Sequence, residues 1–216
     1  MRRDEEDGRL VIEGAQEERR GAGRPWRTRG ARRRSRLVTA IGALSLVGTS
    51  LVAAGAFGGG PTAGAAVSVA VGTTPVAEAF DSANGDVYVA NETSGTVSVV
   101  SGTSVAATLT VGTKPVAVVY DPVNGHVYVA NETSGTVSVV SGATVTATLT
   151  VGTKPVALAV DTTSGLVAVA DEGAAEVSLV TGTAVAGVPV GRTPDGVVFD
   201  PSNGELYVAD KGSSTL

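Results

Sequence analysis

A small set of basic side chains has the residue types and the spacing to bind anions together. Beyond residue 36 the sequence has only four Lys or Arg residues, all in short glycine-containing loops: Lys114, Lys154, Arg192 and Lys211. If these loops lie on one rim, positive charge gathers there, which suits a carboxylate or an acidic polymer. The alternative is that these side chains are solvated and form exposed ion pairs, which add little stability. Their partners would be glutamates of neighbouring loops, namely Glu92, Glu132 and Glu172.

Aspartate is a second recurring residue type, and it could form a ring of metal ligands. Four aspartates stand at one position of a repeated pattern: Asp81, Asp121, Asp161 and Asp200. Each begins an Asp-x-x-x-Gly sequence, in which the carboxylate commonly accepts hydrogen bonds from the backbone of its own turn. We therefore predict turns at these positions, with no metal and no cofactor.

These recurring residues belong to a repeat of about forty residues. Three copies and a partial fourth occupy residues 71–110, 111–150, 151–189 and 190–216. A period of this length is typical of solenoids and propellers. Within each copy, turn sequences separate short segments rich in Val, Tyr, Thr and Ala, which is the pattern of successive antiparallel strands. Residues 121–125, for example, read Asp-Pro-Val-Asn-Gly and have the composition of a tight hairpin.

The pattern inside one copy predicts which strands are buried. Residues 127–130 are apolar at every position, as expected of a strand covered on both faces. Residues 144–151 alternate between threonine and apolar residues, which predicts a half-exposed outer strand with its threonines on one face. Four such strands describe a propeller blade. We therefore predict an all-β fold, a β-propeller of four-stranded antiparallel blades with three to four blades in a partial or truncated ring. This fits better than a β-helix or helical repeats.

Residues 66–216 resemble a known repeat family through three motifs. These are Val-Tyr-Val-Ala-Asn at 87–91 and 127–131 with its relative at 206–210, Asn-x-x-Ser-Gly-Thr-Val-Ser-Val-Val, and Val-Gly-Thr-Lys-Pro. The sequence is similar to the YVTN-type β-propeller repeats of secreted and cell-surface prokaryotic proteins. The resemblance implies extracytoplasmic recognition or scaffolding, with no single activity shared by the family. The third copy departs from the first motif at 167–171, where the tyrosine is missing.

Ring closure is a further expectation that this resemblance raises. The family typically builds seven blades, and residues 66–216 supply three to four. Residues 66–71 resemble the last strand of a blade, and the copy at 190–216 supplies a first and a second strand. An open stack leaves strand edges and an apolar blade face uncovered. We therefore expect either that the chain is a fragment of a longer propeller or that it self-associates to close the ring.

The first 65 residues differ from the repeats in composition. Residues 1–36 contain twelve Arg and seven acidic residues, and we expect a basic, disordered region there. Residues 37–57 carry no charge, and the small residues Ala-Gly-Ala follow at 63–65. This pattern predicts that 37–65 is a cleaved secretory signal or, if uncleaved, a membrane anchor with a small-residue linker. The repeats would then lie outside the cytoplasm, in a protein that is secreted, periplasmic or held at the cell surface.

Together these patterns predict an exported, non-catalytic binding or scaffold module. Its partner would be a protein, a glycan or a small anionic ligand on the loop rim. Nucleic acid is not expected, because the arginines flank an apolar segment and are mixed with acids, and the absence of cysteine means that the fold uses no disulfides. The only histidine, His126, has no nucleophile or base grouped with it. The alternatives are a structural surface array and a propeller hydrolase or lactonase, with Asp195 and Glu78 as its candidate acids.

Overall fold

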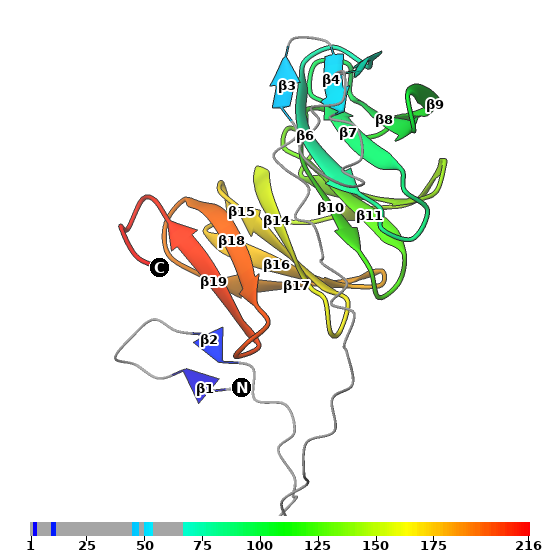
Figure 1. The fold of residues 1–216 in the computed structure, drawn as a ribbon. Helices are drawn as coiled ribbons and strands as arrows, with labels where there is room; N and C mark the ends of the chain where they lie inside the picture. Colours follow the sequence, from blue (N-terminus) through cyan, green and yellow to red (C-terminus); the bar gives the residue numbers. More distant parts are fainter. Residues whose placement is uncertain (1, 4–9, 12–44, 48–49, 54–66) are drawn as a thin grey trace, which may run out of the picture.

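The computed structural model describes residues 2–3, 10–11, 45–47, 50–53 and 67–216 (Figure 1). The predicted basic region 1–36 and the predicted signal or anchor segment 37–65 lie almost entirely outside these residues. Strand β1 pairs with β2, and β4 pairs with both β3 and β5. The bounds are β1 (Arg2–Arg3), β2 (Leu10–Val11), β3 (Ser45–Val47), β4 (Ser50–Ala53) and β5 (Val67–Ala70). Among the described residues, no helix has the length and apolar character needed to span a membrane.

Three four-stranded antiparallel sheets and half of a fourth form the rest of the chain, side by side along an open arc (Figure 1). Blade 1 consists of β6 (Pro75–Phe80), β7 (Val87–Asn91), β8 (Thr96–Ser101) and β9 (Ser104–Thr110). Blade 2 consists of β10 (Pro115–Asp121), β11 (His126–Asn131), β12 (Thr136–Ser141) and β13 (Thr144–Thr150). Blade 3 consists of β14 (Pro155–Asp161), β15 (Leu166–Asp171), β16 (Glu176–Thr181) and β17 (Ala184–Pro189). Blade 4 contains β18 (Pro194–Asp200) and β19 (Glu205–Asp210).

The strands of every blade pair in sequence order, as they do in a propeller blade. The predicted all-β fold of four-stranded antiparallel blades, with three to four blades present, is therefore confirmed. The described blades do not close into a ring, because β18 packs on blade 3 while blade 1 lies at the other end of the arc (Figure 1).

The core of the protein lies between successive blades. Tyr88 and Val97 of blade 1 share one cluster with Val129 of blade 2, and Tyr128 shares the next cluster with Val169 of blade 3. All five side chains are almost completely buried, and each such burial contributes about 1.5–3 kcal/mol. Both faces of a sheet are used in this way, which explains why the second strand of the repeat is apolar at every position.

The hairpins between the first and second strands are Asx turns. Asp121 Oδ1 accepts a hydrogen bond from the backbone amide of Val123 at 2.8 Å. Gly125 closes the turn with a φ of 73°, in the left-handed region that favours glycine. The same contact between a carboxylate and the amide two residues later occurs at Asp81, Asp161 and Asp200. The four aspartates therefore have the turn role that the sequence predicted.

The outer strand β13 differs from the simple alternation predicted for it. The register of β12 and β13 shifts between Val139 and Val140, so that Val139 faces Ala147 and Val140 faces Val145. Thr146 is the extra residue of this bulge. As a result Val145 packs into the core between blades 1 and 2, whereas Ala147 packs into the core between blades 2 and 3. The prediction that the threonines share one face, opposite all the apolar residues, is wrong for this reason.

Strand β5 occupies the place of an outer strand that precedes blade 1. Its residues stand one repeat before the end of β9 in the sequence. Val69 is 4% exposed and packs against Val89 and Val100 on the face of blade 1 that points away from blade 2. The expectation that 66–71 resembles the last strand of a blade agrees with this position.

Candidate functional site: a charged loop rim

Two loops of each blade meet at one rim of the arc, and they carry all four predicted site residues. One loop leads into the first strand of a blade, and the other joins its second and third strands. The backbone amides of Glu132 and Glu172 donate to the carbonyl oxygens of Lys114 and Lys154, each at 2.9 Å. In blade 4 the Gly212 amide donates to the Arg192 carbonyl at 2.8 Å, which places Lys211 beside Arg192. The structure therefore brings each basic residue next to the neighbouring loop of its own blade.

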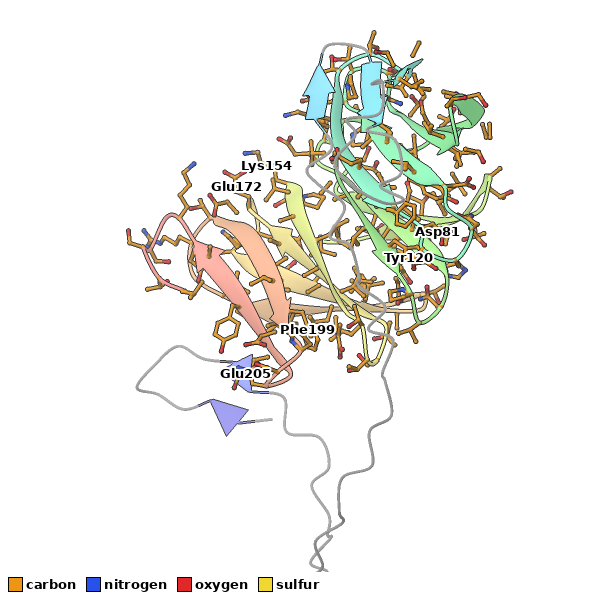
Figure 2. All side chains as sticks on the ribbon, viewed as in Figure 1. Asp81, Tyr120, Lys154, Glu172, Phe199 and Glu205 are labelled. Carbon is orange, nitrogen blue, oxygen red and sulfur yellow. The ribbon has the colours of Figure 1, made fainter. Side chains whose placement is uncertain are left out.

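Lys114 and Lys154 are paired with glutamates. Lys114 Nζ lies 2.5 Å from Glu132 Oε2 and 3.7 Å from Glu92 Oε1, so that it connects blades 2 and 1. The hydrogen bond to Glu132 raises the pKa of Lys114. Lys154 Nζ donates to Glu172 Oε2 at 2.7 Å, and this contact lowers the pKa of Glu172 (Figure 2). Two of the four basic residues are thus largely neutralised by ion pairs with glutamates of neighbouring loops, which was the alternative to an anion site in the sequence analysis.

Blade 4 has a different charge pattern on the same rim. Lys211 stands where blades 1–3 have a glutamate, and Thr193 stands where blades 2 and 3 have a lysine. Arg192 and Lys211 are both exposed, and neither forms an ion pair with a described residue. The Arg192 amide donates to Ser213 Oγ at 3.0 Å, so the Ser213 hydroxyl lies beside the Arg192 backbone. Two positive charges without an ion pair, together with polar loop groups, therefore adjoin each other on blade 4.

The opposite rim is acidic, but its carboxylates serve the hairpins. Asp81 caps its own turn and also interacts with the Tyr120 hydroxyl of blade 2; desolvation, followed by this hydrogen bond, raises the pKa of Tyr120 (Figure 2). Asp121 is fully buried, and its Oδ2 has no hydrogen-bond partner. The residue of blade 3 that corresponds to Tyr120 is Val160, which has no hydroxyl to donate. His126 begins β11 at this rim and is only half-buried.

The two candidate acids of the enzyme hypothesis lie far apart in the arrangement of blades. Glu78 is in β6 of blade 1, and Asp195 is in β18 of blade 4, so that blades 2 and 3 stand between them. Burial raises the pKa of Glu78, whereas Asp195 is exposed. Within 67–216 and the short described segments before it, no three His, Cys, Asp or Glu side chains are grouped so that they could hold a metal ion. The described structure thus does not bring these acids into one site.

Comparison with known proteins defines the class of this fold. No family model and no curated protein matches the sequence. The chain is similar in structure to a streptogramin B lyase, with a TM-score of 0.62, 9% identity, and coverage of 74% of this chain and 55% of that one. It is also similar to a protein of unknown function from Desulfotomaculum acetoxidans, with a TM-score of 0.62, 14% identity, and coverage of 77% of this chain and 58% of that one. A third similar structure is hydrazine synthase of Kuenenia stuttgartiensis, with a TM-score of 0.56, 20% identity, and coverage of 62% of this chain and 41% of that one.

These similarities identify the fold as that of β-propeller proteins. The chain spans less than two thirds of the length of each of the three structures. Identities of 9–20% establish a shared fold and leave the function to be argued from the residues of this chain.

Proposed function

We propose that this chain is an exported, non-catalytic β-propeller module that binds an anionic ligand at the blade 4 end of its loop rim. The observation that carries the proposal is the adjacent pair Arg192 and Lys211, exposed and without an ion pair among the described residues. A guanidinium and an ammonium in neighbouring loops suit a carboxylate, a sulfated glycan or an acidic segment of a protein. Lys114 and Lys154 contribute less, because Glu92, Glu132 and Glu172 compensate their charge.

Export is part of the proposal and rests on the sequence before the repeats. A basic region at 1–36, an uncharged segment at 37–57 and small residues after it have the order of a secretory signal or membrane anchor. The repeat motifs add to this, because they resemble those of YVTN-type propellers of secreted and cell-surface proteins. We therefore propose that the chain belongs to that family, and that the blades lie outside the cytoplasm.

A propeller hydrolase or lactonase is the second candidate function. Burial raises the pKa of Glu78, which favours this function, because a carboxyl group with a raised pKa is better suited to act as a general acid. A turnover assay with ester and lactone substrates separates the two functions. Hydrolysis that is lost in Glu78→Gln would support the enzyme.

The binding proposal is tested with dextran sulfate as the anionic probe and uncharged dextran as its control. At low salt we expect the full chain to bind dextran sulfate, and we expect the double variant Arg192→Ala/Lys211→Ala to bind it about tenfold or more weakly. The matched control is Lys114→Ala/Lys154→Ala, which removes two paired lysines and should change the affinity less than threefold. Equal losses in the two double variants, or no binding by the unmodified chain, would refute the proposed site.

A further inference from the structure

Blade 3 has two carboxyl groups where blades 1 and 2 have an amide and a hydroxyl. In blade 1, Asn91 Nδ2 donates to Thr96 Oγ1 at 3.1 Å and to Ser98 Oγ at 3.0 Å. Blade 2 repeats both bonds at the same distances, from Asn131 to Thr136 and Ser138. These contacts join the two ends of the loop between the second and third strands. In blade 3 the amide is replaced by Asp171 and the threonine by Glu176.

The two acids of blade 3 converge at one point beside Gly152. Asp171 and Glu176 face each other in the register of β15 and β16. A Cβ atom placed on Gly152 would lie 2.6 Å from Glu176 Oε1 and 2.7 Å from Asp171 Cγ. Asp171 is 0% exposed; its Oδ2 accepts from Ser178 Oγ at 2.7 Å, and its Oδ1 has no partner. One buried carboxyl group thus lacks the donor that an asparagine would bring to this site.

A proton would supply the missing donor. We propose that Asp171 and Glu176 form a shared proton-binding site that closes the 171–176 loop when protonated and loosens it when both groups are ionised. A protonated carboxyl group can donate to the facing carboxylate, much as Asn91 donates to Thr96. Two ionised carboxylates in one poorly solvated place repel each other and leave a lone pair unsatisfied.

The electrostatic environment of the pair supports this assignment. Desolvation raises the pKa of Asp171 to about 6. The hydrogen bonds from Ser178 and the Gly152 amide oppose this shift in part, and the charge of Glu176 adds to it. Among the elements next to the pair, the loop before β14 carries one charged group, Lys154. The loop between β15 and β16 carries Glu172. Two further cations of the rim, Lys114 and Lys211, act on Glu172 and lower its pKa together with Lys154. Strand β17 presents Gly187 next to Glu176 and carries no charged residue.

Blade 4 has a single buried acid at this position. Asp210 occupies the place of Asp171; its Oδ2 accepts from the Gly191 amide at 2.9 Å, and its Oδ1, like Asp171 Oδ1, has no partner. Thr215 faces it in place of Glu176. The second carboxyl group is therefore what makes blade 3 different.

The direction of the pH effect follows from the raised pKa of Asp171. A carboxyl group that binds its proton more tightly in the folded chain stabilises the fold below that pKa, and this stabilisation is lost as the pH rises through about 6. The effect should therefore be present at pH 5.0 and nearly absent at pH 7.5. The folded-to-unfolded ratio should shift about tenfold between these values on account of this group.

The test is urea unfolding of the full chain at pH 5.0 and 7.5, followed by circular dichroism, for the unmodified protein and Asp171→Asn. We expect the ratio of their unfolding constants to change about tenfold between the two pH values, because asparagine carries its own donor. We expect hydrogen exchange of the amides at 171–176 to slow towards pH 5.0, after correction for the intrinsic rate, only in the unmodified chain. A ratio that is the same at both pH values would overturn the proposal.

Two further variants keep the test decisive. If Asp171→Asn does not fold, Glu176→Thr restores the threonine of blades 1 and 2, and it should reduce the pH dependence in the same direction. Glu172→Gln is the matched control, since it removes an acid from the same loop but outside the pair. A pH profile that changes as much in Glu172→Gln as in Glu176→Thr would contradict the assignment to Asp171 and Glu176.

Discussion

Blades 1 and 2 are nearly copies of each other, whereas blades 3 and 4 depart from them in the core strands, in the hairpins and at the loop rim. Residues 87–102 and 127–142 are identical, and both segments form the same two strands with the same buried asparagine. In blade 3 that asparagine becomes Asp171, and in blade 4 the rim glutamate becomes Lys211. The comparison teaches that the repeat keeps apolar residues between blades even where their identity changes, as from Tyr128 to Ala168, while the loop rim gains an acid in blade 3 and a base in blade 4.

The largest expected effect tests whether the shared core carries the stability. Tyr88→Ala removes a side chain that is 0% exposed and whose hydroxyl donates to the Gly142 carbonyl at 3.1 Å. We expect a loss of about 3–5 kcal/mol in the free energy of unfolding, measured by urea titration. Tyr207→Ala changes the corresponding residue of blade 4, which is only half-buried, and should have a smaller effect. Similar losses in both variants would contradict the comparison.

A second prediction gives blade 2 part of the chemistry of blade 3. Asn131→Asp places a carboxylate at a fully buried position and removes the donor to Thr136 and Ser138. We expect destabilisation of about 1–3 kcal/mol at pH 7.5. Burial favours the neutral acid, so the loss should shrink at pH 5.0. Urea unfolding at both pH values measures it, and a loss of equal size at both would show that the site does not respond to protonation.

A smaller effect concerns the contact between blades 1 and 2 at the acidic rim. Tyr120→Phe removes the hydroxyl that interacts with Asp81 and leaves Asp81 in the condition of Asp121, whose Oδ2 has no partner. We expect a modest decrease in stability, smaller than that of Asn131→Asp at pH 7.5, because Tyr120 is only partly buried. The measurement is a shift in the urea midpoint at neutral pH. An unchanged midpoint would mean that this hydrogen bond contributes nothing.

The smallest expected effect concerns the paired lysines. Lys114→Ala breaks the ion pairs with Glu132 and Glu92, and exposed pairs of this kind are screened by salt. We expect a slight decrease in the thermal midpoint at low ionic strength and none at 0.5 M salt, a concentration at which the Debye length falls to about 4 Å. A decrease that persists at high salt would indicate that Lys114 has a packing role in addition to its charge.

The sequence predicted the fold because the forces that form a blade are local and repeated. Asp-x-x-x-Gly turns, the apolar second strand and the period of about forty residues each have a direct physical meaning, and the structure places the corresponding elements where these patterns indicated. The bulge at Thr146 was missed, because an extra residue in one strand becomes visible only when its partner strand is known.

The candidate site could be predicted only in part. Four basic residues on one rim follow from strand order, but which of them are neutralised depends on side-chain distances such as that between Lys154 and Glu172. The paired acids of blade 3 were missed, although a signal was present. Aligning the copies shows that asparagine becomes Asp171 and threonine becomes Glu176 five residues later, and residues at the two ends of one loop face each other across a hairpin.

The central claim is that blade 4, and not blades 2 and 3, offers the free positive charge. The most direct test is hydrogen exchange of the full chain with and without dextran sulfate at low salt. We predict slower exchange in 190–193 and 211–214, and no change in 111–114 and 151–154. Equal protection of the loops of all blades, or protection confined to the loops of Lys114 and Lys154, would contradict the account.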